Sequence, residues 1–404
     1  MWFGKQYFFI KLCSSFIQIT HKKNEQYNQS VNDILFQTQF YEWRKHNMKK
    51  RIGILTSGGD CPGLNATIRG LVKASYNLMD CVFVASLNGF EGLITGNMKK
   101  MMSAHFSGIL MKGGTILGTH RTPHKDMRKI GPDGIDKVQA MVDNYAKYEL
   151  DCLVCIGGNG THKNANMLKE EGLNIVGLPK TIDNDIWGTD VTFGYQTAVN
   201  TATDVIDKIH TTADSHDRVM LIELMGNKTG WLTLNSGLAG GADIIIIPEI
   251  PFDDDAIVQA LYKRHEAGKD FSIIAVAEGA MSQKEVSMTK KELKKYRQKL
   301  GYRYIIERIA DRIAEKTGYE TRVVIPGHIL RGGSPSAYDR TIATRVGAFG
   351  AKLIAEGQYG YTVSMINDKC VPTPLEEVSG LLKYVPKDHP LIETARLIGI
   401  SFGE

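Results

Sequence analysis

Several features that would define a special class of protein are missing from this sequence of 404 residues. The longest apolar runs, such as residues 244–248, fall far short of the roughly 20 residues that a membrane-spanning helix needs. Six cysteines lie scattered between Cys13 and Cys370, which excludes the dense disulfide framework of a small secreted scaffold. The sequence also has no low-complexity tract and no short repeat. These absences predict a folded cytoplasmic protein with no membrane partner.

Excess charge is also missing. The formal net charge is +5, and residues 1–47, with six basic and three acidic side chains, leave only +2 for the rest. This balance gives no reason to expect a nucleic-acid partner. Hydrophobic residues make up 43% and charged residues 23% of the chain, which is ordinary for a protein with a full core.

The length exceeds the roughly 150 residues expected of one domain, so we expect two domains. Residues 1–47 lack clear periodicity and are interpreted as a disordered extension or a mis-assigned start before Met48. The first domain is expected at 48–190 and the second at 191–404, with C-terminal segments able to return to the first.

From residue 51 onward, short apolar runs alternate with segments that have apolar residues at three- and four-residue spacing. This rhythm is typical of βαβ units and predicts an α/β protein with a mostly parallel sheet and helices on both faces. A basic run within an expected helical region, residues 283–318, is interpreted as a solvated face. The expected strands are 52–55, 81–85, 152–156, 175–178, 219–224, 243–247, 272–277 and 322–325.

One acidic turn follows an expected strand at residues 179–185, Pro-Lys-Thr-Ile-Asp-Asn-Asp. Ligands of open α/β sheets collect at the carboxyl ends of strands. A fold alone gains nothing from crowding two carboxylates at a turn, so a functional site is the better interpretation. One carboxylate can take a proton from an attacking hydroxyl while the other helps to hold a cation. This chemistry suits phosphoryl transfer.

Glycine-rich loops follow two other expected strands, at residues 56–65 and 157–161, and helical patterns follow both loops. Glycines let the backbone approach a phosphate, and a helix N-terminus offers free N–H groups. Tight strand-to-helix turns remain the alternative interpretation. A third glycine-rich loop, residues 113–123, delivers Arg121, which could neutralise a transferred phosphoryl group or form a surface ion pair.

Arg218, Arg322 and Arg331 lie near the ends of later strands and would suit a sugar phosphate. Glu278 ends the run 272–277 and is interpreted as an acceptor for sugar hydroxyls, with a helix cap as the alternative. His328 alone would more often be a hydrogen-bonded histidine. Cys152 and Cys155 have CxxC spacing within a strand, so they are expected to be buried thiols on opposite faces.

Taken together, Gly58-Gly-Asp-Cys-Pro-Gly, Gly157-Gly-Asn-Gly, the acidic turn, Met225-Gly and Gly327-His-Ile-Leu-Arg-Gly-Gly resemble the 6-phosphofructokinase family. The resemblance implies two similar Rossmann-like domains, the first for ATP and Mg²⁺ and the second for fructose 6-phosphate. It also implies glycolytic phosphoryl transfer to the sugar 1-hydroxyl. A homo-oligomer, dimer or tetramer, would share arginines between active sites.

Residue roles follow from the same resemblance, position by position. The catalytic residues would be Asp183 as the base, Arg121 at the phosphoryl group, and Thr181. Donor binding would involve Gly58, Arg121, Gly157, Gly158, Asn159, Gly160 and Thr161, and metal binding Asn159 and Asp185. The substrate pocket would comprise Thr181, Asp183, Met225, Gly226, Asn227, Glu278, His328 and Arg331, with Arg218 and Arg322 from a neighbouring subunit.

Two positions depart from the family pattern. The family commonly has Asp where this chain has Asn159, so a charge usually credited with holding Mg²⁺ is absent, and an amide is a weaker partner for a hard cation. Asn227 stands where a bacterial ATP enzyme often has arginine.

Two positions bear on the phosphoryl donor. Gly160 leaves room for the nucleoside part of ATP, whereas pyrophosphate enzymes place Asp there. Lys180 resembles the lysine of pyrophosphate enzymes. A side chain that blocks a pocket outweighs one that adds a charge beside it, which favours ATP. Pyrophosphate-dependent phosphotransfer is the alternative.

Two other classes of protein share some of these features. An NAD kinase shares a similar glycine loop but would not need the acidic turn or the element at 328–333. A non-catalytic ligand-sensing subunit of the same fold is suggested by Asn159 and Asn227, although Asp183, Thr181 and Arg121 are all present.

Overall fold

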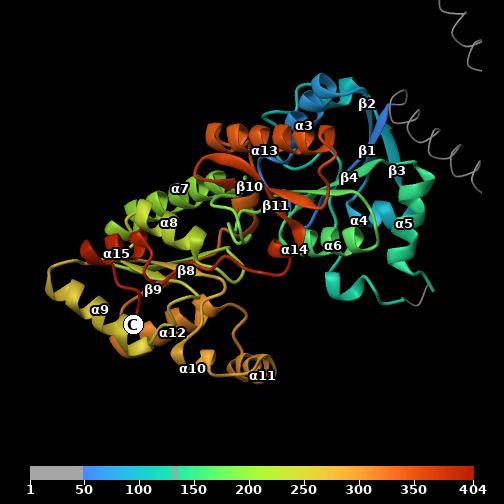
Figure 1. The fold of residues 1–404 in the computed structure, drawn as a ribbon. Coiled ribbons are helices and arrows are strands. Elements are labelled where there is room, and N and C mark those ends of the chain that lie inside the picture. The colour runs from blue at the N-terminus through green and yellow to red at the C-terminus, as the bar shows by residue number, and fades with distance from the viewer. Residues whose placement is uncertain (1–48, 131–133) are drawn as a thin grey trace, which may run out of the picture. The chain divides into compact units, whose positions relative to one another are not determined.

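The computed structural model describes residues 49–130 and 134–404. Residues Lys50–Glu404 form one compact unit, most of whose elements are labelled in Figure 1. The expectation for residues 1–47 falls outside the described part of the chain, and the boundary expected near residue 190 stays a prediction. No helix among the described residues is long and apolar enough to cross a membrane.

The first sheet has seven strands within the described residues, in the order β11-β10-β5-β4-β1-β2-β3. The inner strands run parallel, and β3 and β11 close the two edges in antiparallel pairs with β2 and β10. The strands are β1 (Lys50–Ser57), β2 (Cys81–Ser86), β3 (Met98–Met101), β4 (Cys152–Gly157), β5 (Ile175–Pro179), β10 (Tyr361–Ile366) and β11 (Lys369–Pro374).

The second sheet is wholly parallel, in the order β7-β8-β6-β9. Every strand expected from the sequence is present, which confirms an α/β fold with mostly parallel sheets. Three strands were not expected: β3, β10 and β11. The second sheet consists of β6 (Val219–Leu224), β7 (Ile244–Ile246), β8 (Ser272–Ala277) and β9 (Thr321–Val324).

Helices cover both faces of each sheet, and both faces carry apolar side chains because alternate strand residues point to opposite faces. Ile54 packs in a central core that also contains residues of the second sheet, whereas Leu55 packs in an outer cluster. Cys152 and Cys155 divide in the same way and are buried free thiols, as expected. The helices are α3 (Leu64–Leu78), α4 (Phe90–Thr95), α5 (Lys137–Lys147), α6 (Asn159–Glu170), α7 (Tyr195–Asp214), α8 (Trp231–Ala239), α9 (Asp254–Glu266), α10 (Gln283–Val286), α11 (Lys290–Leu300), α12 (Ile305–Thr317), α13 (Ala337–Ala355), α14 (Leu375–Val378) and α15 (Pro390–Leu397), with 3-10 turns η1 (Ser103–Phe106), η2 (His124–Asp126) and η3 (Gly327–Arg331).

Helices α3 and α13 lie side by side, far apart in sequence (Figure 1). Two glycines allow this approach. A Cβ at Gly70 would lie 2.6 Å from the Thr344 carbonyl oxygen, and a Cβ at Gly347 would lie 2.2 Å from the Thr67 carbonyl oxygen. The atoms in conflict are backbone atoms, so a side chain at either position would force the helices apart.

Gly347→Ala is therefore expected to lower the free energy of unfolding by about 1–3 kcal/mol. The steric overlap destabilises the fold by more than the higher helix propensity of alanine stabilises it. Gly350→Ala on the same helix is the matched control. Its Cβ would meet a side-chain atom of Leu178 at 3.0 Å, which can yield. Urea unfolding measures both, and equal stability of the two variants would contradict close backbone contact.

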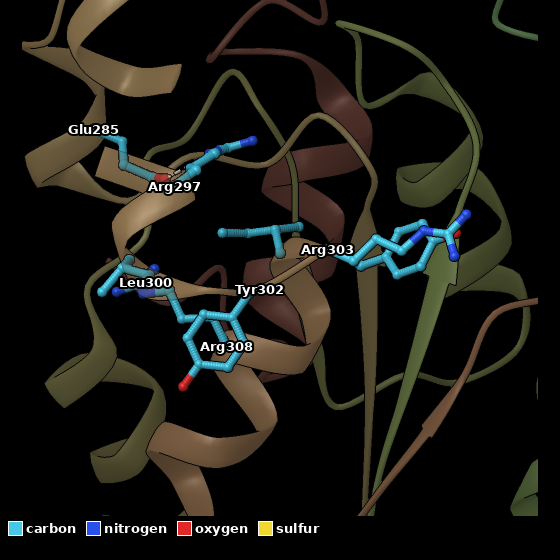
Figure 2. A pocket seen from close by; sticks show the side chains of 8 residues that line it. Glu285, Arg297, Leu300, Tyr302, Arg303 and Arg308 are labelled. Atoms are coloured by element: carbon cyan, nitrogen blue, oxygen red, sulfur yellow. Dashed lines mark hydrogen bonds and ion pairs between the residues drawn. The ribbon is translucent and has the colours of Figure 1, made fainter. Parts of the chain in front are cut away.

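A small cavity of about 30 Å³ lies where α10, α11 and α12 meet (Figure 2). Two of its three arginines have ion-pair partners: Arg297 pairs with Glu285 at 2.8 Å, and Arg308 pairs with Asp254 at 2.6 Å. A space of this size holds about one water molecule. Helix α11 has no buried residue, which confirms that its basic run is a solvated face. The cavity is lined by Glu285, Arg297, Leu300, Tyr302, Arg303, Tyr304, Ile305 and Arg308.

Candidate active site

The acidic turn follows β5 directly, and local hydrogen bonds hold its shape. The Asp183 amide donates to the Thr181 hydroxyl at 3.0 Å. Asn184 has a positive φ of 52°, which asparagine tolerates better than most residues. Its side-chain oxygen accepts from the Thr192 amide at 3.1 Å, and the Thr192 hydroxyl donates to the Thr181 carbonyl at 2.8 Å. The turn is therefore fixed from within the chain before any ligand binds.

Both carboxylates of this turn are buried. Burial raises the pKa of Asp183, and the positive charge of Arg331 is the largest influence in the opposite direction. One oxygen of Asp183, Oδ1, is buried without a hydrogen-bond partner. Burial also raises the pKa of Asp185 to about 7, and the charge of Asp183 adds to this shift. Two buried carboxylates this close favour a site that receives a proton or a cation.

The first glycine loop lies against the acidic turn. Lys180 is buried, and its ammonium donates to the Gly59 carbonyl oxygen. A Cβ at Gly58 would lie 3.6 Å from the same ammonium nitrogen. Burial lowers the pKa of Lys180. The turn and this loop are thus in direct contact through one buried cation.

Two arginines converge on the same loop. Arg331 donates to the Asp60 carbonyl at 3.2 Å. A Cβ at Gly59 would lie 2.7 Å from a guanidinium nitrogen of Arg331 and 3.3 Å from one of Arg121. Glycine at position 59 therefore allows both guanidinium groups to gather beside the backbone. Such a cluster of cations, together with Lys180, suits a polyphosphate.

The second glycine loop joins β4 to the N-terminus of α6. A Cβ at Gly157 would collide with Thr161, whose hydroxyl donates to the Ser57 carbonyl at 3.4 Å. The two loops are therefore linked to each other. Gly160 is exposed and has open space around its Cβ position. The free N–H groups of a helix N-terminus attract phosphate oxygens.

Glu278 and the turn at Met225-Gly226-Asn227 lie at the carboxyl edge of the second sheet. Glu278 Oε1 accepts from the Gly226 amide at 3.2 Å and from the Asn227 amide at 2.7 Å. The neighbouring Thr229 hydroxyl donates to the Asp183 carbonyl at 3.3 Å. This contact brings the turn of the second sheet beside the acidic turn of the first.

Arg218 and Arg322 lie elsewhere. They stand at the amino ends of β6 and β9, at the edge of the second sheet opposite Glu278. Both pair with Glu320: Arg218 Nε is 3.0 Å from its carboxylate, and Arg322 shares the same oxygen. His328 is exposed on η3. A single chain therefore does not bring these two arginines to the other site residues.

Three contributors were missed from the sequence: Thr192, Thr229 and Lys383. Each bonds to the acidic turn or its flank, Thr192 from shortly after the turn and Thr229 and Lys383 from distant parts of the chain. Lone threonines and one lysine in an apolar segment carry no spacing signal that could have identified them.

The carboxylates fit a magnesium ion that arrives with a phosphorylated substrate. No group of three or more His, Cys, Asp and Glu side chains in the described part of the chain could hold a metal. Mg²⁺ is usually bound through one or two carboxylates together with substrate phosphates. Asp185, buried in the same turn as the unpartnered Oδ1 of Asp183, could supply such a carboxylate.

A buried carboxylate of β6, that of Glu223, makes the stability of the folded protein depend on pH. Burial raises the pKa of Glu223 from 4.5 to about 7, the charge of Glu278 adds to this, and the Ile306 amide at the start of α12 opposes it. The pKa of Glu223 is higher in the folded protein than in the unfolded chain. The free energy of unfolding therefore keeps its full value below about pH 4.5 and falls as the pH rises through about 7.

Glu223→Gln is expected to remove that loss. Above pH 7 the variant should be more stable than the parent by up to about 3 kcal/mol, and near pH 4 the two should be equal. Urea unfolding at both pH values measures the difference. A gain that is the same at both pH values would show that Glu223 does not titrate in this way.

Comparison with known proteins agrees with this geometry. The family model described as Phosphofructokinase matches residues 51–354. An ATP-dependent 6-phosphofructokinase from Spirochaeta thermophila is 52% identical over 363 residues, covering 89% of this chain and 99% of the relative. A pyrophosphate–fructose 6-phosphate 1-phosphotransferase from Amycolatopsis mediterranei is 42% identical over 343 residues, covering 84% of this chain and 97% of the relative.

A solved structure is similar as well. The crystal structure of Pichia pastoris phosphofructokinase in the T-state has a TM-score of 0.69 and 32% sequence identity over 82% of this chain and 35% of that longer chain. The chain is thus an α/β protein of two mostly parallel sheets, in which glycine loops follow strands β1 and β4 of the first sheet. The chain belongs to the phosphofructokinase family, which confirms the resemblance drawn from its motifs.

Proposed function

We propose that this chain is an ATP-dependent 6-phosphofructokinase, which transfers the terminal phosphoryl group of ATP to the 1-hydroxyl of fructose 6-phosphate in glycolysis. The observation that carries this proposal is the contact between the acidic turn and the first glycine loop through Lys180. A base and a phosphate cradle must adjoin for in-line transfer. The 52% identical relative named as ATP-dependent supports the same assignment.

Asp183 is the general base. It takes the proton of the sugar 1-hydroxyl as that oxygen attacks the terminal phosphorus, and ADP leaves. Thr181 and Thr229 bond to its backbone and set its direction. Arg121 is placed beside Gly59 to neutralise charge on the transferring group.

The two glycine loops and the N-terminus of α6 bind the donor, through Gly58, Gly157, Gly158, Gly160 and Thr161. The open space at Gly160 supports a bulky nucleotide. Mg²⁺ bound near Asp185 would shield the phosphate charges. Asn159 is proposed to lie beside this ion. The buried Lys180 and the 42% identical pyrophosphate-dependent relative keep pyrophosphate as the second candidate donor.

Fructose 6-phosphate binding falls to Glu278, Arg331, His328 and the turn at 225–227, with Arg218 and Arg322 supplied by a neighbouring copy in a homo-oligomer. The position of these two arginines at the opposite sheet edge supports sharing between subunits. Exposed apolar side chains on and beside β9 and on η3, namely Val323, Ile325 and Ile329, support an interface there.

We also propose that the protein works in the cytoplasm. The five cysteines among the described residues form no disulfide, and four of them are buried. Cysteines outside disulfides suit a reducing compartment.

The test is a side-by-side assay of the purified full chain with fructose 6-phosphate, Mg²⁺ and either ATP or pyrophosphate. Turnover with ATP well above that with pyrophosphate supports the proposal. Preference for pyrophosphate would reverse the donor assignment. No turnover with either donor would favour a ligand-sensing subunit.

A further inference from the structure

One short segment near the C-terminus touches both halves of the candidate site. Residues 381–385, here called the C-terminal strap, follow α14 and run past the acidic turn. Leu381 and Tyr384 are exposed, whereas Val385 is 2% exposed. The strap thus alternates between exposed side chains, at Leu381 and Tyr384, and partly or fully buried ones, at Leu382, Lys383 and Val385.

The strap pairs with the acidic turn through its backbone. Leu382 forms an antiparallel bridge with Ile186, and the Lys383 amide donates to the Asp185 carbonyl at 2.9 Å. The Lys383 ammonium donates to the carbonyl oxygens of Thr189 and Asp190, each at 2.8 Å. These bonds join the strap to the backbone of Asp185 and of the residues that follow it.

The other end of the strap is tied to the second sheet. The Trp231 indole N–H donates to the Lys383 carbonyl at 2.8 Å, and the Lys383 ammonium lies 5.2 Å from the Trp231 ring centroid. The Val385 amide donates to Glu249 Oε1 at 3.0 Å, and the same oxygen accepts from Gly230 at 3.0 Å. The strap therefore bridges the two sheets.

Asn159 links the strap to the donor loop. Its amide nitrogen Nδ2 donates to the Leu381 carbonyl oxygen. A carboxylate at position 159 has no hydrogen to donate at neutral pH, and its charge would face that carbonyl oxygen. The amide is therefore the functional group that this contact requires.

We propose that the C-terminal strap clamps the donor loop to the acidic turn, and that Asn159 is a positioning residue of this clamp. The inference rests on the proposed function, because it assigns the strap to the donor site of a kinase. It also accounts for the amide at position 159, since Asp185 would remain as the carboxylate for a bound metal. Groups that orient a site commonly change affinity or activity by about 10–100-fold when removed.

The first test is Asn159→Asp in the full chain, with exposed Asn97→Asp as the matched control for an added charge. Amide hydrogen exchange of the strap, measured without ligands, should accelerate about five- to tenfold in the first variant, because one hydrogen bond is lost. The Michaelis constant for ATP should rise about tenfold with a smaller change in kcat. The control should match the parent in both.

A second variant removes the strap's own cation. Lys383→Met keeps the apolar stem but loses both ammonium bonds, and exposed Lys387→Met is its control. The clamp requires faster exchange across residues 381–385 in Lys383→Met and parent-like exchange in Lys387→Met. Unchanged exchange in both Asn159→Asp and Lys383→Met would overturn the clamp.

A lower Michaelis constant for ATP in Asn159→Asp, with unchanged exchange, would indicate that position 159 serves metal binding. This result would also overturn the clamp. Failure of the proposed function is a separate result. Exchange is measured on the ligand-free protein, so an altered strap in a chain that turns over neither donor would reject the kinase assignment and leave the clamp in place.

Discussion

Replacing Asp183 by serine is expected to lower kcat by about 10²–10⁴-fold, because the sugar hydroxyl then loses the group that takes its proton. The Michaelis constant for fructose 6-phosphate should change much less, since the other pocket groups remain. Steady-state kinetics with ATP and Mg²⁺ measure both. The buried, unpartnered Oδ1 of Asp183 is the structural reason to expect so large an effect.

The control for this variant is Asp270→Ser, which removes an exposed carboxylate. It should keep parent kinetics. Near-normal kcat in Asp183→Ser, with an unfolding free energy like that of the parent, would remove Asp183 from the role of base. Loss of fructose 6-phosphate binding without loss of kcat would place Asp183 in the pocket only.

Gly160→Asp is expected to reduce kcat/KM with ATP by roughly 100-fold or more, while use of pyrophosphate falls far less. A carboxylate here would occupy the space for the nucleotide and repel its phosphate, and like charges in contact cost several kcal/mol. Assays with the two donors give the ratio directly.

The structure makes this variant a clean test. A Cβ at position 160 would have no atom within 4 Å, so an added side chain does not disturb the fold. Gly160→Ala is the matched control and should keep ATP use near that of the parent. If the ratio between donors is the same in Gly160→Asp and in the parent, the steric argument for ATP is wrong.

Most of the fold could be predicted because its strands are apolar runs that end in glycine or polar turns. The hairpin of β10 and β11 was missed, although its signal was present. Asn367 and Asp368 form its two-residue loop, and both have positive φ, which this pair of residue types tolerates. The surrounding residues alternate weakly, so the strands did not stand out.

The candidate site was predictable wherever its residues follow strands that are neighbours in the sheet. The acidic turn and both glycine loops meet for that reason, through pairs such as Ser57 with Gly157 and Gly157 with Pro179. The bond from Asn159 to Leu381 spans more than two hundred residues and depends on the path of an irregular segment. Neither composition nor periodicity encodes such a path.

Strand β10 has a consequence for how the chain is made. It pairs with β5, so the first sheet remains incomplete until residues 361–374 have left the ribosome. Throughout translation of the second sheet, β5 therefore presents an open edge of unpaired amides and carbonyls. A nascent chain arrested before residue 361 should bind chaperones that recognise exposed strands, and should lose that binding once the hairpin has been synthesised.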